Sequence, residues 1–166
     1  MLPMISTAQT QVKSIPEFDV SRYMGTWYEI AKLPNWFQRK CTQGTQARYK
    51  ALGPAEIEVN NKCSTASGEE IQATGLARPN GSGRPAQLEV RFAPTWTAWL
   101  PWVWGAYWVL DLDAEYQLAA VGDPSKSYLW ILSRTPVVSS DKYDALLQRM
   151  NLMGFDITKL EKTRQN

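Results

Sequence analysis

Covalent chemistry in this chain would fall to two cysteines, Cys41 and Cys63, since the sequence contains no histidine. Without histidine, Ser-His-Asp triads and most catalytic zinc sites are excluded, and two cysteines are too few for a zinc cluster. The cysteines lie on either side of a hairpin predicted by Gly53-Pro54, so they either form a disulfide or remain reactive free thiols. A disulfide closing a loop of about 20 residues would stabilise the fold by roughly 3 kcal/mol and would indicate an oxidising compartment.

A second unusual feature is the uncharged segment 92–110, which holds five of the eight tryptophans of the chain. Its two prolines argue against a membrane-spanning helix, although its length would suffice for one. Tryptophan favours the interface between membrane and water, so this segment predicts a loop that contacts lipid headgroups or a protein surface. The contact residues we predict are Trp96, Trp99 and Trp102. The alternative interpretation is that these rings pack over Trp36 and Phe37 or form a dimer contact.

The bulk composition fits one domain of 166 residues, with a net charge of +2 from interspersed basic and acidic side chains. Because no basic run could follow a phosphate backbone, we expect no nucleic-acid partner. Residues 1–16 are expected to be a flexible segment, followed by one domain over residues 17–163. The first residues lack the basic start and long apolar run of a signal peptide, so we expect any leader to lie outside this sequence.

Short runs of alternating apolar and polar residues, separated by turn signals, predict eight strands. They cover residues 25–32, 47–51, 57–62, 71–77, 88–92, 107–112, 116–121 and 128–134. Their spacing is typical of an antiparallel meander. Eight such strands close into an up-and-down β-barrel just wide enough for one small ligand, so the predicted fold class is all-β.

The hydrophobic period changes after Pro136, where apolar residues follow the spacing of a helix. The apolar positions are Tyr143, Leu146, Leu147 and Met150. Polar residues 139–141 offer an N-cap, and Gly154 ends the pattern. We expect one C-terminal amphipathic α-helix packed on the outside of the barrel, followed by a short extra strand within residues 156–162.

Three motifs within the predicted barrel carry a resemblance to a known family. They are Gly25-Thr26-Trp27-Tyr28-Glu29, Leu110-Asp111-Leu112-Asp113-Ala114-Glu115-Tyr116 and Tyr128-Leu129-Trp130-Ile131-Leu132-Ser133-Arg134-Thr135-Pro136. With one helix after the last strand, the chain resembles the lipocalins, in particular the subgroup of bacterial lipocalins (Blc) that is similar to apolipoprotein D and plant temperature-induced lipocalins. The resemblance covers residues 18–159.

The resemblance implies structural roles at the base of the barrel. In lipocalins the tryptophan matching Trp27 closes the barrel, and the arginine matching Arg134 lies across it. A guanidinium stacked on an indole contributes about 0.5–2 kcal/mol. Gly25 has no side chain, so another backbone or a large ring can lie against it. We expect Glu29, which points inward near the base, to be a structural hydrogen-bond partner rather than a catalytic residue.

The family register places a largely apolar set of side chains on the inner face of the barrel: Ala47, Tyr49, Val59, Ala73, Leu88, Val90, Phe92, Tyr107, Val109, Tyr128 and Trp130. This lining suits a long-chain lipid with its tail inside, such as a fatty acid or a lysophospholipid, and the tyrosine hydroxyls could anchor its head group. The alternative is that these side chains fill the barrel. The small residues Ala47, Ala73 and Gly75 favour a cavity instead.

The resemblance implies a lipid-binding carrier of the bacterial cell envelope, active in membrane maintenance or stress, in the periplasm or outer membrane of a Gram-negative bacterium. Either an acylated cysteine was removed with the leader, or the protein is a soluble periplasmic relative. We expect no catalytic residue, metal or cofactor, and a monomer or weak homodimer with peripheral membrane contact. Two alternatives stay open: a protein-interaction module that uses the tryptophan-rich loop, and an enzyme on the same barrel that acts on a lipid.

Overall fold

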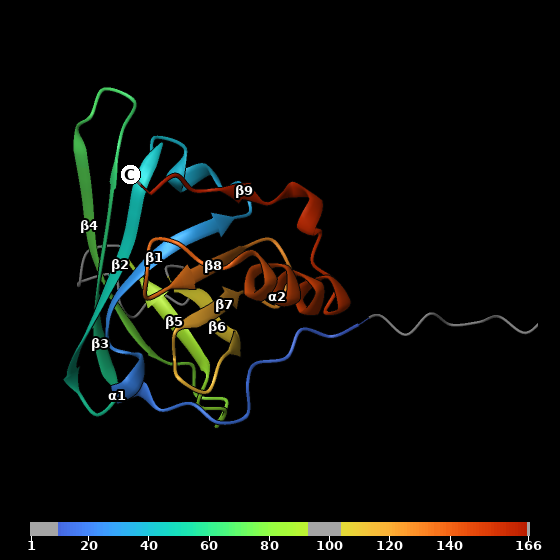
Figure 1. Ribbon diagram of the computed structural model, residues 1–166. Helices are drawn as coiled ribbons and strands as arrows, with labels where there is room; N and C mark the ends of the chain where they lie inside the picture. Colours follow the sequence, from blue (N-terminus) through green and yellow to red (C-terminus); the bar gives the residue numbers. More distant parts are fainter. Residues whose placement is uncertain (1–9, 93–103, 166) are drawn as a thin grey trace, which may run out of the picture.

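The computed structural model describes residues 10–92 and 104–165, which form one β-barrel with a helix on its outer side (Figure 1). The barrel strands are β1 (Gly25–Lys32), β2 (Gln43–Gly53), β3 (Glu56–Ser64), β4 (Glu70–Pro79), β5 (Gln87–Arg91), β6 (Gly105–Leu112), β7 (Leu118–Gly122) and β8 (Leu129–Ser133). The other elements are α1 (Val20–Tyr23), the short 3-10 helix η1 (Trp36–Gln38), α2 (Ser140–Leu152), the short 3-10 helix η4 (Ile157–Lys159) and β9 (Glu161–Lys162).

The barrel is closed by its first strand. Consecutive strands from β1 to β8 pair antiparallel, and β1 pairs with both β2 and β8. This confirms the predicted eight-stranded barrel, whose closure removes the unpaired edges of an open sheet. The first half of β1, from Gly25 to Tyr28, pairs with β2, and the short strand β9 pairs with the other end of β1, at Ala31 and Lys32.

One strand begins later than its sequence pattern predicts. The strand predicted over residues 116–121 starts at Leu118, because Asp113 builds a tight turn before it. The carboxylate of Asp113 accepts hydrogen bonds from the backbone N–H groups of Gln117, at 2.6 Å, and Leu118, at 2.7 Å. Tyr116 lies within this turn with a positive φ of 57°, which no strand residue adopts.

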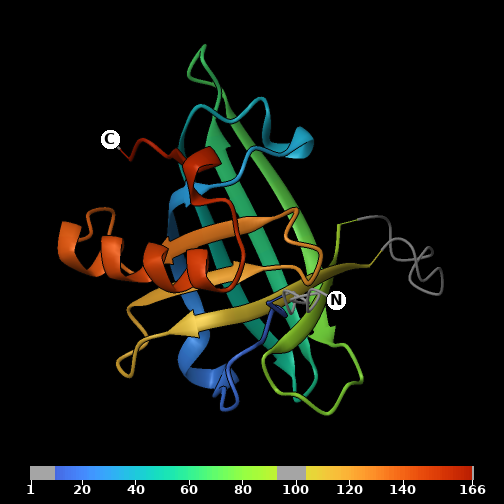
Figure 2. The ribbon, with the colours of Figure 1, turned by 90° about the vertical axis from the view of Figure 1, so that its right-hand side faces the viewer.

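The predicted amphipathic helix is α2, which lies against the outer side of the barrel (Figure 2). Its buried side chains Tyr143, Leu146 and Met150 pack against outward-facing apolar residues of β1, β6, β7 and β8. Arg149 of α2 donates two hydrogen bonds to the carboxylate of Asp111 in β6, at 2.7 and 3.1 Å. The extra strand predicted after this helix covers only β9, because η4 occupies the residues before it. In the described part of the chain, no helix combines the length and apolar character needed to cross a membrane.

One end of the barrel, which we call the closed end, is sealed by the fully buried side chain of Trp27. The guanidinium carbon of Arg134 lies 4.0 Å from the centre of the Trp27 ring. The indole Nε1 of Trp27 donates a hydrogen bond of 2.8 Å to the carbonyl of Tyr23, which joins α1 to β1. Arg134 donates three further hydrogen bonds of 2.8–3.2 Å to backbone carbonyls, those of Arg22, Thr26 and Tyr116.

Gly25 permits this close approach at the start of β1. Its φ is +99°, a conformation that residues with a side chain rarely adopt. A Cβ atom at this position would lie 3.2 Å from a guanidinium nitrogen of Arg134. The absence of a side chain at residue 25 therefore leaves room for the guanidinium of Arg134 across the start of β1.

Candidate ligand-binding cavity

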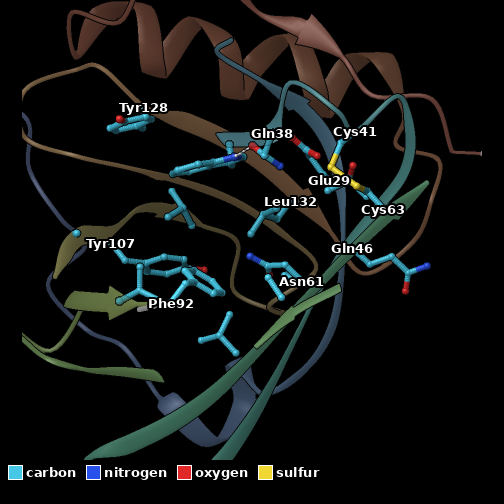
Figure 3. A pocket seen from close by; sticks show the side chains of 18 of the residues that line it. Glu29, Gln38, Cys41, Gln46, Asn61, Cys63, Phe92, Tyr107, Tyr128 and Leu132 are labelled. Atoms are coloured by element: carbon cyan, nitrogen blue, oxygen red, sulfur yellow. Dashed lines mark hydrogen bonds between the residues drawn. A yellow bond between two sulfur atoms is a disulfide. The ribbon is translucent and has the colours of Figure 1, made fainter. Parts of the chain in front are cut away.

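A cavity of about 710 Å³ lies inside the barrel. Aliphatic and aromatic side chains form most of its wall, together with a few polar groups (Figure 3). Pockets that bury small-molecule ligands typically measure about 300–1,000 Å³. The interior is therefore hollow rather than filled, and it has the size of a ligand site.

Nine of the side chains that the family register places inside the barrel line this cavity. They are Ala47, Tyr49, Val59, Ala73, Val90, Phe92, Tyr107, Tyr128 and Trp130. Leu88 and Val109 also face inward, but they are buried in the core and do not line the cavity. The family register gave the direction of these two side chains, but it carries no information about whether a side chain reaches the cavity.

The expectation that Gly75 leaves room in the cavity is wrong. A Cβ atom on Gly75 would meet the carbonyl of Arg91 and would lie 2.7 Å from the ring of Phe92. The missing side chain therefore accommodates the neighbouring strand and one aromatic ring, as is common for glycine within a sheet. Ala47 and Ala73, in contrast, do line the cavity.

Two of the tyrosines that face the cavity belong to a hydrogen-bonded chain. The hydroxyl of Tyr107 lies 2.6 Å from that of Tyr23 and 2.7 Å from that of Tyr49. Burial raises the pKa of Tyr49 to about 12 and raises the pKa of Tyr23 and Tyr107 well above the ordinary tyrosine value. The three hydroxyl groups have three hydrogens, and two of these form the two hydrogen bonds that link the tyrosines. One hydrogen therefore remains to donate to another group.

Tyr23 was not predicted as part of this group. It lies in α1, before the first strand, where strand alternation gives no information about side-chain direction. Its ring packs on Trp27 and Tyr49, with centroid distances of 4.9 and 5.4 Å. The sequence predicted that tyrosine hydroxyls could anchor a lipid head group. In the structure, the hydroxyls of Tyr49 and Tyr107 already bond to each other within one cluster.

Polar residues complete the cavity wall. Glu29, Gln38, Thr45 and Asn61, which we call the polar wall, are four of them, and Gln46, Lys62 and Asp123 also line the cavity. Figure 3 shows Glu29 and Gln38 near the sulfur atoms, with Asn61 further along the barrel. The side-chain oxygen of Gln38 accepts hydrogen bonds from Nε1 of Trp130, at 2.9 Å, and from the amide of Asn35, at 2.7 Å. With its oxygen used in this way, Gln38 has its NH₂ group left to donate.

Strand alternation already contained a signal for part of the polar wall. Thr45 has the same parity on β2 as the inward-facing residue Ala47, and Asn61 has the same parity on β3 as Val59. Gln38 could not be found in this way, since it lies in η1 outside the strands.

The expected role of Glu29 as a structural hydrogen-bond partner is wrong. Its side chain is only 2% exposed, yet neither carboxyl oxygen is hydrogen-bonded to any described residue. Burial raises the pKa of this carboxyl above its ordinary value, against the opposing positive charge of Lys32 and the nearby polar groups of Thr45, Thr163 and Gln38. None of these neighbours is in hydrogen-bonding geometry with the carboxyl, so Glu29 is a buried acid without a hydrogen-bond partner in the described part of the chain.

Cys41 and Cys63 form a disulfide, which confirms the predicted bridge and removes the free-thiol alternative for both residues. The bridge links the segment after η1 to β3, and both cysteines line the cavity. It therefore holds the chain segment that carries Gln38 against the barrel wall.

The structure describes only the last part of the predicted tryptophan-rich contact loop. Trp96, Trp99 and Trp102 lie outside the described residues, so their contact with a membrane or a partner stays a prediction. Trp104, at the start of the next described segment, lines the cavity, and the guanidinium of Arg78 lies 3.7 Å from its ring centre. Trp36 also borders the cavity and is 72% exposed.

The whole barrel, including the cavity, matches known proteins. The model of a lipocalin-like domain matches residues 18–165. The chain is 38% identical over 162 residues to temperature-induced lipocalin-1 of Arabidopsis thaliana, covering 96% of this chain and 86% of that one. It is 37% identical over 155 residues to the outer membrane lipoprotein Blc of Citrobacter freundii, covering 93% and 83%. Insecticyanin from the tobacco hornworm Manduca sexta shares the fold, with a TM-score of 0.71 and 22% identity over 92% of this chain and 83% of that chain. As its motifs predict, the chain belongs to the lipocalin family.

Proposed function

We propose that this protein binds one single-chain lipid, a fatty acid or a lysophospholipid, with the tail inside the barrel. Lipocalins bind small hydrophobic ligands. The observation that supports a lipid is the cavity of about 710 Å³ with mainly aliphatic and aromatic walls. Moving each methylene from water into such a cavity is favourable by about 0.8 kcal/mol. Affinity should therefore rise with chain length until the cavity is full.

The contact residues in this proposal are the nine predicted side chains that line the cavity, from Ala47 on β2 to Trp130 on β8. Leu88 and Val109 are buried in the core and are not assigned to the ligand. Proteins that store or carry a lipid need no nucleophile or acid–base pair at the ligand. The cavity serves in this proposal as a carrier site rather than an active site.

The same proposal places the protein in a cell envelope, at the outer membrane or in the periplasm of a Gram-negative bacterium, with a role in membrane maintenance or stress. Two observations support it. The disulfide between Cys41 and Cys63 is typical of oxidising compartments. The relative from Citrobacter freundii is named an outer membrane lipoprotein, whereas the relative from Arabidopsis thaliana is a plant protein.

The test is calorimetric titration with saturated fatty acids and lysophospholipids of increasing chain length. We compare the parent with Ala73→Trp, which adds an indole to the cavity wall, and with Gln72→Trp, which adds the same group at the adjacent exposed position. We expect affinity to rise with chain length in the parent, to fall at least 10-fold for the longest chains in Ala73→Trp, and to stay unchanged in Gln72→Trp. A parent that binds none of these lipids, or binds all lengths equally, contradicts the proposal.

A further inference from the structure

We infer that the cavity selects a lipid whose polar end is an uncharged hydroxyl group, held between the carboxyl of Glu29 and the side-chain amide of Gln38. This inference rests on the proposed lipid-binding function and specifies the end group of the ligand. It differs from the proposal in the previous section because it ranks neutral alcohols above free carboxylates of the same chain length.

The carboxyl of Glu29 has the properties of a ligand-recognition group. Both of its oxygens are buried without a hydrogen bond to any described residue, and the residue lines the cavity. A buried polar group without a partner destabilises a folded protein. Asn61, further along the same wall, also has a buried side-chain oxygen without a partner among the described residues. The oxygens of an ionised Glu29 and the side-chain oxygen of Asn61 can only accept hydrogen bonds, so a ligand that satisfies them must donate.

The backbone holds Glu29 firmly at this position. The pairing of β1 with β8 shifts register between Glu29 and Ala31, and such irregularities commonly redirect a side chain next to a site. The amide of Gln165 donates to the backbone carbonyls of Glu29 and Thr45, at 2.8 Å each, and so bridges β1 to β2. The unpaired carboxyl is therefore presented by a braced strand, not by a loop that could turn it toward water.

Gln38 supplies the complementary donor. Its oxygen is occupied by Trp130 and Asn35, which leaves the NH₂ group to donate. This amide lies near enough to Glu29 to lower the pKa of the carboxyl, although the two groups are not in hydrogen-bonding geometry. A hydroxyl fits between them, because it donates one hydrogen bond to the carboxyl and accepts one from the amide.

Other end groups suit this site less well. A carboxylate has only acceptor atoms and carries a negative charge, so it would meet the oxygens of Glu29 and Asn61 without a hydrogen to share. An ammonium group would pair with an ionised Glu29, but it could not accept the hydrogen bond from Gln38. The positive charge of Lys32 beside the carboxyl also opposes a second cation there.

The experiment measures dissociation constants for dodecanol, dodecanoate and dodecylamine at pH 7.5 by calorimetry. We compare the parent, Glu29→Gln and Glu69→Gln, the last being a matched loss of one negative charge at an exposed position. In the parent and in Glu69→Gln, we expect dodecanol to bind at least 10-fold more tightly than dodecanoate. In Glu29→Gln, whose amide can donate to a carboxylate, we expect this ratio to fall below about threefold. Thermal melts verify that each variant is folded.

A second variant keeps the inference testable if Glu29→Gln does not fold. Asn61→Val removes the other unpaired oxygen, and we expect it to change the dodecanol-to-dodecanoate ratio in the same direction, by two- to fivefold. The inference is overturned if dodecylamine binds more tightly than dodecanol, or if the ratio is the same in every variant. Equal binding of all three compounds by the parent overturns only the end-group preference, whereas no binding of any of them overturns the lipid-binding proposal as well.

Discussion

The two halves of the barrel interior differ in whether their buried polar groups are hydrogen-bonded. At the closed end, Arg134 donates to three backbone carbonyls, the indole of Trp27 donates to Tyr23, and the tyrosine hydroxyls bond to one another. In the cavity half, the carboxyl of Glu29 and the side-chain oxygen of Asn61 are buried without a partner among the described residues. Trp27 and Glu29 are only two residues apart on β1 and share its inward face.

This contrast separates stability from binding within a single strand. Buried polar groups that are paired contribute to folding, whereas unpaired ones oppose it. We infer that the closed end holds the barrel together and that the cavity half retains its unpaired acceptors for a ligand. Substitutions at the closed end should therefore lower the free energy of unfolding strongly. Replacement of the unpaired acid Glu29 should raise it.

The largest expected effect is that of Trp27→Ala. The side chain is fully buried, and its loss leaves a void and removes the surface on which Arg134 lies. We expect the free energy of unfolding to fall by about 3–5 kcal/mol, measured by urea denaturation. The control is Trp36→Ala, at a side chain that is 72% exposed, where we expect less than about 1 kcal/mol. Equal melting temperatures for Trp27→Ala and the parent would contradict the role of the closed end.

A smaller loss is expected for Arg134→Ala. This change removes the cation that lies 4.0 Å from the Trp27 ring centre and leaves three carbonyls without their donor. We expect a loss of about 2–3 kcal/mol and no change in the order of ligand affinities. Arg149→Ala is the control, because it removes an arginine from an exposed ion pair on the outer helix. If Arg134→Ala changed ligand preference more than stability, the separation of the two halves would be wrong.

The smallest effect, and the one of opposite sign, is expected for Glu29→Gln. Burial raises the pKa of Glu29, with Lys32 and the polar groups of Thr45, Thr163 and Gln38 opposing that shift. A carboxyl with a raised pKa in the folded state stabilises the fold below its unfolded pKa, and this contribution is lost as pH rises through the folded pKa. At pH 7.5 the substitution should therefore raise the free energy of unfolding of the ligand-free protein, by about 1–2 kcal/mol.

A comparison of Glu29→Gln with the parent at lower pH separates the titration of Glu29 from that of the other carboxyls. Near pH 4 the parent carboxyl is protonated in the folded state, so the difference between Glu29→Gln and the parent should shrink toward zero. Glu69→Gln, at an exposed carboxyl, should show no such pH-dependent gain. A destabilised Glu29→Gln at pH 7.5 would mean that the carboxylate has a structural partner after all.

Much of the barrel could be predicted because its signals are local. Alternation along each strand depends only on the two-residue repeat of extended backbone, so it grouped the side chains by face, and the family register then identified the inward face that carries Tyr49, Val59 and Tyr107. The spacing of Tyr143, Leu146 and Met150 likewise predicted the buried face of α2. Cys41 and Cys63 were recognised as a pair because one hairpin separates them.

Local patterns could not give the height of a side chain within the barrel or the groups that it meets there. Those depend on how the strands pack together, which buries Leu88 and Val109 in the core while Val90 and Tyr107 line the cavity. They depend as well on elements outside the strands. α1 brings the hydroxyl of Tyr23 to Tyr107, and η1 brings Gln38 beside Glu29. A carboxyl is left without a hydrogen bond by the arrangement of all its neighbours at once, which no repeat in the chain encodes.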